Sequence, residues 1–416
     1  MKTYLVGGAV RDRLLAYPVS EFDWLVVGET VESMLARGFR PVGKDFPVFL
    51  HPVTHDEYAL ARTERKTAPG YKGFEVYAAP DVTIEEDLLR RDLTINAMAL
   101  DSDDRLIDPF HGQDDLNNRI LRHVSPAFSE DPVRILRVAR FAARYAHLGF
   151  KVAEETRQLM QEMVVKGEAD HLVPERVWAE MCKALQETTP TAFFEVLRDC
   201  DALKVIFPEI DALFGVPQPE QYHPEIDTGI HTLMVLEQVS RLSAKVDIRL
   251  AALLHDLGKG LTPRSGWPSH HGHEKLGLSL LENFCERLRV PRNYKNLCLL
   301  VMQYHTHCHR LLELRADTLT DMLQAIFAFK HDERLEAFIL ACEADARGRT
   351  GFENRDYPQA DFMRQAALAA KNIDTHAILH ENNKGADIGI AIRKLRIAAI
   401  ERFKQHYSAT VKQITV

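Results

Sequence analysis

The sequence of 416 residues lacks long apolar runs and closely spaced cysteine pairs. Because no stretch approaches about 20 uninterrupted apolar residues, we expect no membrane span. The six cysteines include no C-x-x-C pair, which is typical of free thiols in a reducing cytosol. The apolar start MKTYLVGG is interrupted too early, at Arg11, for a signal peptide. We therefore expect a cytoplasmic protein.

The chain also lacks an excess of basic residues, low-complexity tracts and repeats of fixed period. Its formal net charge is −8, so it is not coated in basic surface, and a nucleic-acid partner would need a local basic face. The absence of repeats excludes a solenoid. With 46% hydrophobic residues, a chain of this length is expected to form two to four soluble domains.

The patterning of the chain changes from mixed α/β to helical. Before residue 126, the apolar segments TYLVGG, FDWLVVG and PVFLHP are expected to be strands. From Pro126 onward, apolar residues recur at helical steps of three and four. A Pro-rich stretch at 208–229 separates two helical regions, and a second shift lies near 310–330. We therefore expect an α+β first part followed by helices alone.

The most informative pattern lies in the first 25 residues. An apolar strand runs into Gly7-Gly8, and a helix containing Arg11 follows. Glu21 and Asp23 follow, separated by one residue, and residues two apart on a strand point to the same side. Their carboxylates can share a Mg²⁺ ion, while the glycines allow close approach of a phosphate. Together these features predict nucleotidyl transfer, although each alone is common in proteins without that activity.

Arginines form the second pattern. Arg91 lies in RRDLTINA, and a guanidinium matches phosphate oxygens, whereas the neighbouring Asp92 could simply cap the next helix. The helix after Pro132 carries four arginines on one face. They would repel one another unless an anion, or carboxylates such as Glu130 and Asp131, lay opposite, so we expect a nucleotide there. These arginines are Arg134, Arg137, Arg140 and Arg144.

Histidines and carboxylates form a third pattern, at the end of the apolar helix that precedes His255-Asp256. A His-Asp pair alone is a weak signal, but His231 lies upstream and Asp345 downstream. Imidazole with carboxylate suits Mn²⁺, Ni²⁺, Fe²⁺ or Zn²⁺, which lower the pKa of bound water. We take these four residues as the metal ligands. Two more histidines, expected to contact substrate or the ligands, are His273 and His305. The alternative is a metal-free fold kept only for packing.

Several motifs in order resemble those of the class II tRNA nucleotidyltransferases, the CCA-adding enzymes of the polymerase-β-like superfamily. They are GGAVRD, the carboxylate pair, RRDLTINA, DPFHG and EDPVRILRVARF. The order of histidines and aspartates also resembles that of HD-domain phosphohydrolases. The resemblance implies an α+β fold with a nucleotidyltransferase head at 1–125, a helical neck at 126–225, an HD domain at 226–330 and a helical tail at 331–416.

The resemblance also implies roles for individual residues. Glu21 and Asp23 match a metal-binding D-x-D pair, with Glu in the first place, and Glu57 is a candidate third carboxylate. Asp131 and Arg134 match the pair that hydrogen-bonds the incoming base in place of a nucleic-acid template. Five further matches to nucleotide-binding residues are Gly8, Arg11, Arg91, Arg137 and Arg140.

The implied reaction is addition and repair of the 3′-terminal CCA of tRNA from CTP and ATP, with Mg²⁺ as cofactor and pyrophosphate as product. The HD domain implies metal-dependent hydrolysis of 2′,3′-cyclic phosphates, 2′-nucleotides and phosphate esters, with a transition metal such as Ni²⁺. The expected partners are tRNA, CTP and ATP, without a membrane, in a monomer or homodimer.

Three rival functions remain open at this stage. A poly(A) polymerase would share the head, but we would expect a longer basic C-terminus and no HD residues. A nucleotide-signalling enzyme would combine both activities without the E-D-P-V-R and R-R-D motifs. A tRNA-binding chaperone would not need intact carboxylates and histidines. Incorporation of CTP and ATP into tRNA lacking its 3′ end separates all three from a CCA-adding enzyme.

Overall fold

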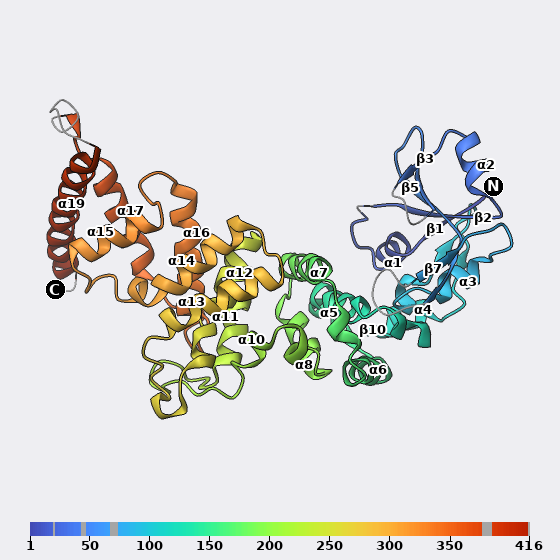
Figure 1. Cartoon of the computed structure of the whole chain (residues 1–416), viewed down its shortest axis with the longest axis horizontal. Helices are drawn as coiled ribbons and strands as arrows, with labels where there is room; N and C mark the ends of the chain where they lie inside the picture. Colours follow the sequence, from blue (N-terminus) through green and yellow to red (C-terminus); the bar gives the residue numbers. More distant parts are fainter. Residues whose placement is uncertain (20, 43–46, 67–73, 377–384, 415–416) are drawn as a thin grey trace. The chain divides into compact units, whose positions relative to one another are not determined.

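A computed structural model describes residues 1–19, 21–42, 47–66, 74–376 and 385–414 of the chain. They divide into two compact units, Met1–Phe207 (unit 1) and Pro208–Val416 (unit 2) (Figure 1). The division falls at the start of the Pro-rich stretch at 208–229. The finer division into head, neck, HD domain and tail stays a prediction.

Unit 1 begins with a seven-stranded sheet of order β3-β4-β5-β2-β1-β8-β9. Strand β2 pairs antiparallel with β1 and parallel with β5, and the remaining neighbours are antiparallel. A separate antiparallel hairpin joins β6 and β7. The strands are β1 (Lys2–Val6), β2 (Asp23–Val27), β3 (Arg40–Val42), β4 (Val48–Leu50), β5 (Glu57–Leu60), β6 (Thr63–Lys66), β7 (Phe74–Tyr77), β8 (Ala99–Leu100) and β9 (Leu106–Ile107).

The sheet forms because its central strand is apolar on both faces. In β2, Leu25 packs into one cluster of buried side chains with Val6 and Leu88, and the next residue, Val26, packs into another with Phe49. This alternation is the period of two that a pleated strand imposes. The helices and helical turns beside the sheet are α1 (Gly8–Leu14), α2 (Val31–Ala36), α3 (Ile84–Leu89), η1 (Thr94–Asn96) and α4 (Gly112–Asn118).

The second half of unit 1 is helical and is built around α5 (Val133–Tyr145), which packs on α7 and α8. The apolar side chains of α5, including Ile135 and Leu136, are fully buried, so its arginines are held on the remaining face. The other elements are β10 (Ile120–Leu121), η2 (Pro126–Glu130), η3 (Ala146–Leu148), β11 (Lys151–Val152), α6 (Glu154–Val165), η4 (Glu168–His171), α7 (Pro174–Gln186), α8 (Thr191–Asp199) and α9 (Leu203–Ile206).

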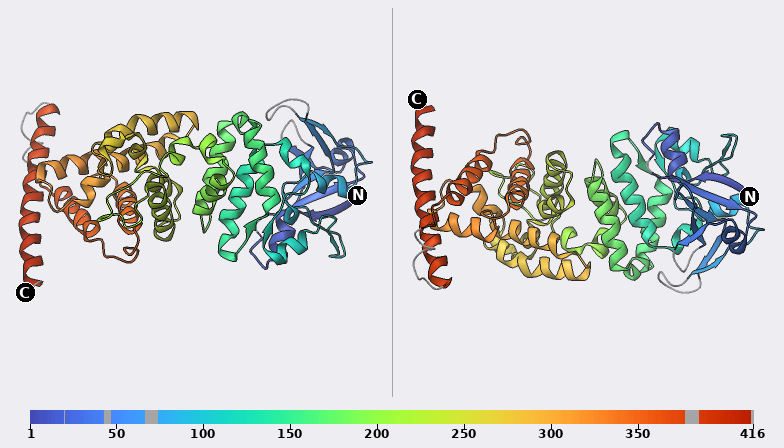
Figure 2. Two further views of the ribbon diagram at one scale, coloured as in Figure 1. Left: turned by 90° about the horizontal axis from the view of Figure 1, so that it is seen from below. Right: turned by 90° about the horizontal axis from the view of Figure 1, so that it is seen from above.

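Unit 2 is helical throughout its described residues (Figure 2). Its central helix α12 is buried along its whole length because α11, α14 and α16 pack around it. The elements are α10 (Pro208–Asp211), α11 (Thr228–Leu242), α12 (Val246–Leu254), η5 (Leu257–Leu261), η6 (Arg264–Gly266), α13 (His273–Arg287), α14 (Arg292–His309), α15 (Ala316–Ala325), α16 (Asp332–Arg347), α17 (Pro358–Lys371) and α19 (Gly385–Ile414).

The predicted α+β class is confirmed, since the strands are confined to unit 1 and helices follow. The segments TYLVGG, FDWLVVG and PVFLHP contain β1, β2 and β4 as expected. Within the described parts of the chain, no helix is long and apolar enough to cross a membrane.

Two candidate active sites

A cavity of about 850 Å³ in unit 1 brings together all the residues that the sequence assigned to nucleotide and Mg²⁺ binding in the head and neck. Basic side chains dominate its walls, which suits a polyphosphate. The predicted residues on these walls are Gly8, Arg11, Glu21, Asp23, Arg91, Asp131, Arg134, Arg137 and Arg140. Further charged residues there are Arg62, Glu64, Arg90, Asp92, Arg144, Arg176, Lys183 and Glu187.

The glycine turn lies against Arg91. Gly7 has a φ of +69°, and a Cβ at this position would lie 2.8 Å from Nη1 of Arg91. A side chain would therefore cost both backbone strain and displacement of the arginine. The absence of a side chain at Gly7 thus allows the Arg91 guanidinium to lie against the backbone at the cavity wall.

The two carboxylates of the E-x-D motif line the same cavity. Asp23 is the first residue of β2, and Glu21 precedes the strand. Desolvation raises the pKa of Asp23, Arg91 lowers it, and Glu21 raises it further. A cation beside Asp23 would offset both the desolvation and the repulsion from Glu21. Glu57 is the partner of Asp23 in the parallel register of β2 and β5, but it does not line the cavity.

The arginines of α5 are held by protein groups from distant parts of unit 1. Nε of Arg137 lies 2.7 Å from Oδ2 of Asp92, and Nε of Arg140 lies 2.6 Å from Oε2 of Glu180. Arg144 pairs with Asp12 at 3.2 Å. Three carboxylates, Asp12, Asp92 and Glu180, therefore bind the arginine face. Of the two carboxylates expected there, Asp131 lines the same cavity and Glu130 does not.

Asp92 does not cap the following helix, contrary to the simpler expectation. Its Oδ1 accepts hydrogen bonds from the Leu93 backbone N–H at 2.8 Å and from Nδ2 of Asn96 at 2.9 Å, while Oδ2 binds Arg137. Burial alone would raise the pKa of Asp92, but Arg137 and Asn96 hold it well below its usual range. Asp92 is thus a buried anion that orients a cavity arginine.

The pair expected to recognise the base is also oriented by protein groups. Asp131 accepts two hydrogen bonds from the guanidinium of Arg176 on α7, at 2.9 and 3.2 Å. Arg134 donates to the backbone carbonyls of Ala127 at 3.0 Å and Arg90 at 2.6 Å. Sequence reasoning missed Arg176, since nothing in its local pattern connects it to a residue 45 positions earlier.

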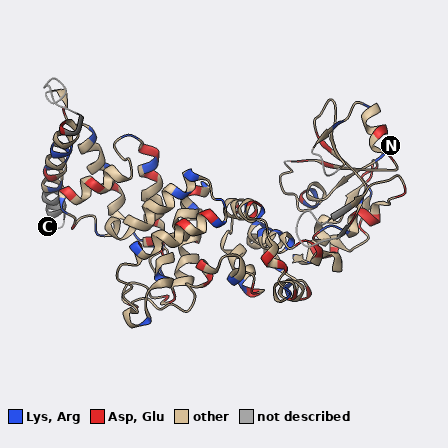
Figure 3. Cartoon of the chain, viewed as in Figure 1, with Lys and Arg blue, Asp and Glu red and all other residues tan. Residues whose placement is uncertain are grey.

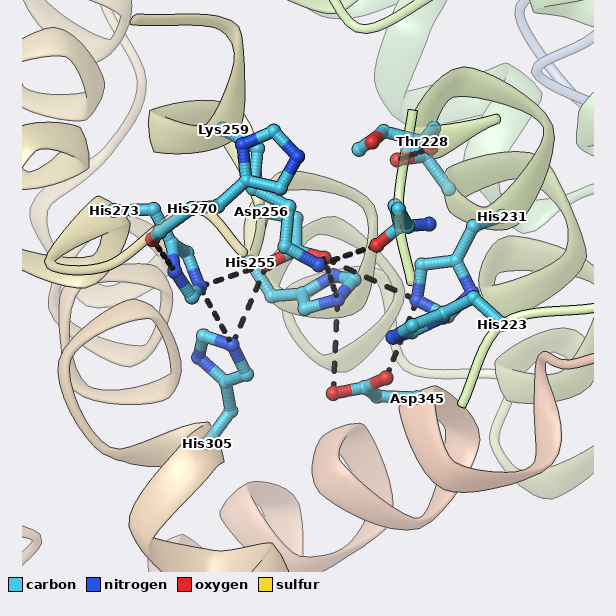
Figure 4. A network of polar contacts seen from close by, with 12 residues as sticks. His223, Thr228, His231, His255, Asp256, Lys259, His270, His273, His305 and Asp345 are labelled. Carbon is cyan, nitrogen blue, oxygen red and sulfur yellow. Dashed lines mark hydrogen bonds and ion pairs between the residues drawn. The ribbon is translucent and has the colours of Figure 1, made fainter. Parts of the chain in front are cut away.

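A second site in unit 2 gathers the four predicted metal ligands in the protein interior (Figure 4). His231 comes from α11, His255 and Asp256 follow α12, and Asp345 comes from α16. Nε2 of His231 lies 3.3 Å from Oδ1 of Asp345, and Nε2 of His255 lies 3.1 Å from Oδ2 of Asp256. Groups of these residues have ligand atoms close enough to share an ion.

Backbone carbonyls determine which ring nitrogen of each histidine faces the cluster. A carbonyl can only accept a hydrogen bond, so each Nδ1 beside one carries the proton, and the Nε2 lone pair is left for an ion. The acceptors are Gly348 for His231 at 2.9 Å, Ala252 for His255 at 2.7 Å, His270 for His273 at 3.0 Å, and Met302 for His305 at 3.1 Å.

Three buried atoms at this site have no hydrogen-bond partner within the described part of the chain. They are Nε2 of His231, Nε2 of His255 and Oδ1 of Asp256. A buried polar atom without a partner is costly, and a divalent cation would satisfy all three. Burial alone would raise the pKa of Asp256 and Asp345, but the surrounding histidines, together with Lys259 beside Asp256, keep both values well below the usual range. The donor set fits a transition-metal ion.

His273 and His305 lie in direct contact with the predicted ligand Asp256 on its other side (Figure 4). Oδ1 of Asp256 lies 3.2 Å from Nε2 of His273 and 3.4 Å from Nε2 of His305, and the two nitrogens are 3.3 Å apart. Three acceptors facing one another in this way need a shared proton or a cation. These residues form a further candidate metal group.

Other residues missed by sequence reasoning surround the ligands. Nζ of Lys259 lies 2.6 Å from Oδ2 of Asp256, and Oε1 of Glu225 lies 3.0 Å from Nδ1 of His231. His309 contacts Asp345 at 2.6 Å. The lysine could have been found from its place three residues after Asp256, one turn further along the chain. Glu225 and His309 carry no local signal.

Profiles of known families match three consecutive parts of the chain. The poly(A) polymerase head domain matches residues 3–122, and the HD domain matches residues 228–333. Between them, residues 149–214 match a profile described as a probable RNA- and SrmB-binding site of polymerase A.

Curated proteins match the chain over nearly its whole length. A multifunctional CCA protein of Methylococcus capsulatus is 64% identical over 97% of this chain and 95% of the relative. One of Thioalkalivibrio sulfidiphilus is 62% identical over 98% of this chain and 100% of the relative.

Solved structures share the fold. A CCA-adding enzyme in complex with CTP aligns with a TM-score of 0.63 at 22% identity, covering 99% of this chain and 91% of that one. The Thermotoga maritima CCA-adding enzyme in complex with tRNA aligns with a TM-score of 0.62 at 20% identity and the same coverage.

Proposed function

Because the chain belongs to the family of the multifunctional CCA proteins, we propose that unit 1 adds and repairs the 3′-terminal CCA of tRNA from CTP and ATP, releasing pyrophosphate. The observation that carries this proposal is the single cavity that holds both the carboxylate pair and the arginine face of α5. A poly(A) polymerase would share the head, but HD-domain residues and the curated relatives favour CCA addition.

In this proposal, Glu21 and Asp23 hold Mg²⁺, which fits the mutual opposition of their charges. A Mg²⁺ ion held by these carboxylates would lower the charge at the α-phosphate and would favour in-line attack by the 3′-hydroxyl of tRNA, with pyrophosphate leaving. Arg11, Arg91 and the backbone at Gly8 hold the triphosphate in place. Glu57, whose Cα pairs with that of Asp23, is a candidate third carboxylate.

Base choice is assigned to Asp131 and Arg134, with Arg137 and Arg140 as further nucleotide contacts. A carboxylate accepts a hydrogen bond from the amino group that C and A share, and a guanidinium donates to ring acceptors. Arg176 orients the Asp131 carboxylate by a two-point contact. Asp131 and Arg134 belong to the neck, so discrimination between bases would not depend on the residues that hold Mg²⁺.

The test is incorporation of labelled CTP and ATP into tRNA that lacks its 3′ end. A CCA-adding enzyme adds two C and one A and rejects UTP and GTP. Addition of A alone to unrelated RNA would support a poly(A) polymerase instead, and no incorporation would contradict the proposal.

We further propose that unit 2 is a metal-dependent phosphohydrolase. His231, His255, Asp256 and Asp345 would hold a transition-metal ion, with Ni²⁺ as the candidate. Such an ion lowers the pKa of bound water and polarises a phosphoryl oxygen. His273, His305 and Lys259, all in contact with Asp256, are placed to bind the phosphate or a second ion. This activity is tested by measuring hydrolysis with one metal ion added at a time. The substrates are 2′,3′-cyclic phosphates, 2′-nucleotides and simple phosphate esters.

The remaining parts of the proposal concern partners. In unit 1, tRNA phosphates would bind a basic strip formed by the arginines of α5. In unit 2, the tail helix α19 offers further basic side chains, Arg393, Lys394, Arg402 and Lys404 (Figure 3). The protein would act in the cytoplasm as a monomer or homodimer.

A further inference from the structure

Asp345 is the one predicted metal ligand of unit 2 that lies beyond the HD profile, which ends at residue 333. It belongs to α16, and its carboxylate faces His231 and His255 (Figure 4). Oδ1 lies 3.3 Å from Nε2 of His231, and Oδ2 lies 3.7 Å from Nε2 of His255. Both oxygens therefore point into the cluster, and a rotation of the carboxylate would move both of them away from an ion.

Two side chains outside the predicted ligand set hold the Asp345 carboxylate in this orientation. Nε2 of His309, the last residue of α14, lies 2.6 Å from Oδ2, and Nη2 of Arg349 lies 3.3 Å from Oδ1. An ionised carboxylate can only accept a hydrogen bond, so Nε2 of His309 carries the proton. The short distance is typical of a hydrogen bond to a charged group. His309 is thus a donor to a ligand rather than a ligand itself.

The tautomer of His309 is opposite to that of the four histidines in the cluster. In those four, Nδ1 donates to a backbone carbonyl and Nε2 is left for an ion. In His309, Nε2 donates, and Nδ1 of the neutral ring is left as an acceptor. Oη of Tyr357 lies 3.1 Å from this Nδ1 and 3.4 Å from Sγ of Cys308, which is a weaker acceptor. A hydroxyl donor at Nδ1 favours the tautomer that Asp345 requires.

The start of α17 fixes the position of Tyr357. Tyr357 directly precedes this helix, and its ring packs edge-on against His309 with the ring centroids 5.8 Å apart. Nε2 of Gln359, in the first turn of α17, donates to the backbone carbonyl of His309 at 3.1 Å. The end of α14, the helix α16 and the start of α17 thus meet behind Asp345.

We propose that His309 and Tyr357 are positioning residues of the unit 2 site. Tyr357 sets the tautomer of His309, and His309 holds the Asp345 carboxylate toward the metal ion. Retention of the ion then depends on residues 345–357, which lie beyond the HD profile. The inference rests on the proposed metal site and hydrolase function of unit 2, and it adds the residues that keep the ion in place.

The test measures the dissociation constant for Ni²⁺, with Mn²⁺ as a second probe, by calorimetry on the full-length protein after chelation. His309→Leu should bind the ion about 10–100-fold more weakly than the parent, and the isosteric Tyr357→Phe about tenfold more weakly. His309→Gln, whose amide N–H can replace the Nε2 donor, should stay within about threefold of the parent.

Three controls separate metal affinity from folding and from binding elsewhere on the chain. Tyr407→Phe removes a hydroxyl from α19, where the ring packs on Phe362 and Phe403, and should bind Ni²⁺ as the parent does. His255→Ala, which lacks a predicted ligand, shows how much Ni²⁺ binds at other places. The metal-free parent and Tyr357→Phe should unfold at the same temperature, because the hydroxyl acts on the bound ion rather than on the fold.

The outcomes distinguish this inference from the hydrolase proposal. If the parent binds Ni²⁺ and both His309→Leu and Tyr357→Phe bind it equally well, the positioning role is wrong and the metal site stands. Equal losses in His309→Gln and His309→Leu would also overturn the role, because packing of the ring rather than its N–H would then matter. If the parent binds neither ion more tightly than His255→Ala does, the metal site itself is wrong, and the proposed hydrolase function fails with it.

Discussion

The two candidate sites hold their charged residues in opposite ways. In unit 1, the carboxylates Glu21 and Asp23 are exposed in an open cavity, while the arginines around them are tied to other protein groups. In unit 2, the predicted ligands are buried, and backbone carbonyls orient the imidazoles of His231 and His255. The first arrangement suits an ion that arrives with its nucleotide. The second suits an ion that stays in the protein.

The physical reason lies in the cost of burying charge. A buried carboxylate needs partners, and Asp256 has Lys259 and four histidines around it. Asp23 keeps more contact with solvent than Asp256 does, although partial desolvation already raises its pKa. The five predictions below test this difference.

The largest effect is expected for Asp23→Ala. Addition of both C and A should fall by about three orders of magnitude or more, because each step uses the same metal position. Hydrolysis by unit 2 should be unchanged. Asp114→Ala, which removes an exposed carboxylate outside the cavity, is the matched control. Addition of C at a near-parental rate would show that the carboxylate pair is not the catalytic site.

His255→Ala or Asp256→Ala should have the opposite effect to Asp23→Ala, with loss of hydrolysis rather than of CCA addition. Hydrolysis should fall by about a hundredfold or more, since a metal ligand is removed, while CCA addition is largely spared. After chelation, adding back single metals should restore addition best with Mg²⁺ and hydrolysis with a transition metal such as Ni²⁺. If a folded His255→Ala protein lost addition as completely as hydrolysis, the two-site interpretation would fail.

A smaller effect is expected on the selection of the incoming base. Asp131→Ala or Arg134→Ala should relax discrimination against UTP and GTP by about 1–3 kcal/mol, which is the value of a contact to a base edge. Rates with CTP should fall less than selectivity does. Misincorporation into tRNA measures the effect, with Arg157→Ala on the surface helix α6 as control. Variants as strict as the parent would place base recognition elsewhere.

The salt concentration should affect tRNA binding much more than hydrolysis of a small ester. If about three phosphates of tRNA are contacted, its affinity should fall about 40-fold between 50 and 200 mM salt, since counterions are released on binding. Hydrolysis of a small ester such as glycerol 2-phosphate should change far less. Equilibrium binding and initial rates over one salt series provide the comparison. An affinity for tRNA that does not respond to salt would contradict a basic strip that follows the RNA backbone.

The smallest effect is expected for Glu21→Asp. The change restores the D-x-D pattern of the resembled family and keeps the charge, so addition should stay within about threefold of the parent. Glu21→Gln, which removes the charge at constant size, should instead lose most activity. A large loss in Glu21→Asp with activity retained in Glu21→Gln would mean that side-chain length, rather than charge, determines how this residue acts.

Local patterns were sufficient to predict much of both sites. Glu21 and Asp23, two residues apart in sequence, line one cavity as expected, although only Asp23 lies on a strand. Helical steps brought Arg134, Arg137 and Arg140 to the wall of the same cavity. His255 and Asp256, adjacent in sequence, mark the second cluster. The partners of these residues were not predictable, because each comes from a segment with its own unrelated pattern.

The sequence by itself therefore determined which carboxylates, arginines and histidines belong to each candidate site. Their spacing along a strand or helix sets which side chains share a face, and this follows from backbone geometry alone. Tertiary structure decided how those groups are used. It paired Arg137 with Asp92, 45 residues away, and His231 with Asp345 from another helix. It also determined which ring nitrogen of His231 faces the cluster, because the Gly348 carbonyl accepts a hydrogen bond from the other nitrogen. These choices depend on packing between distant segments, and no local periodicity encodes which segments will meet.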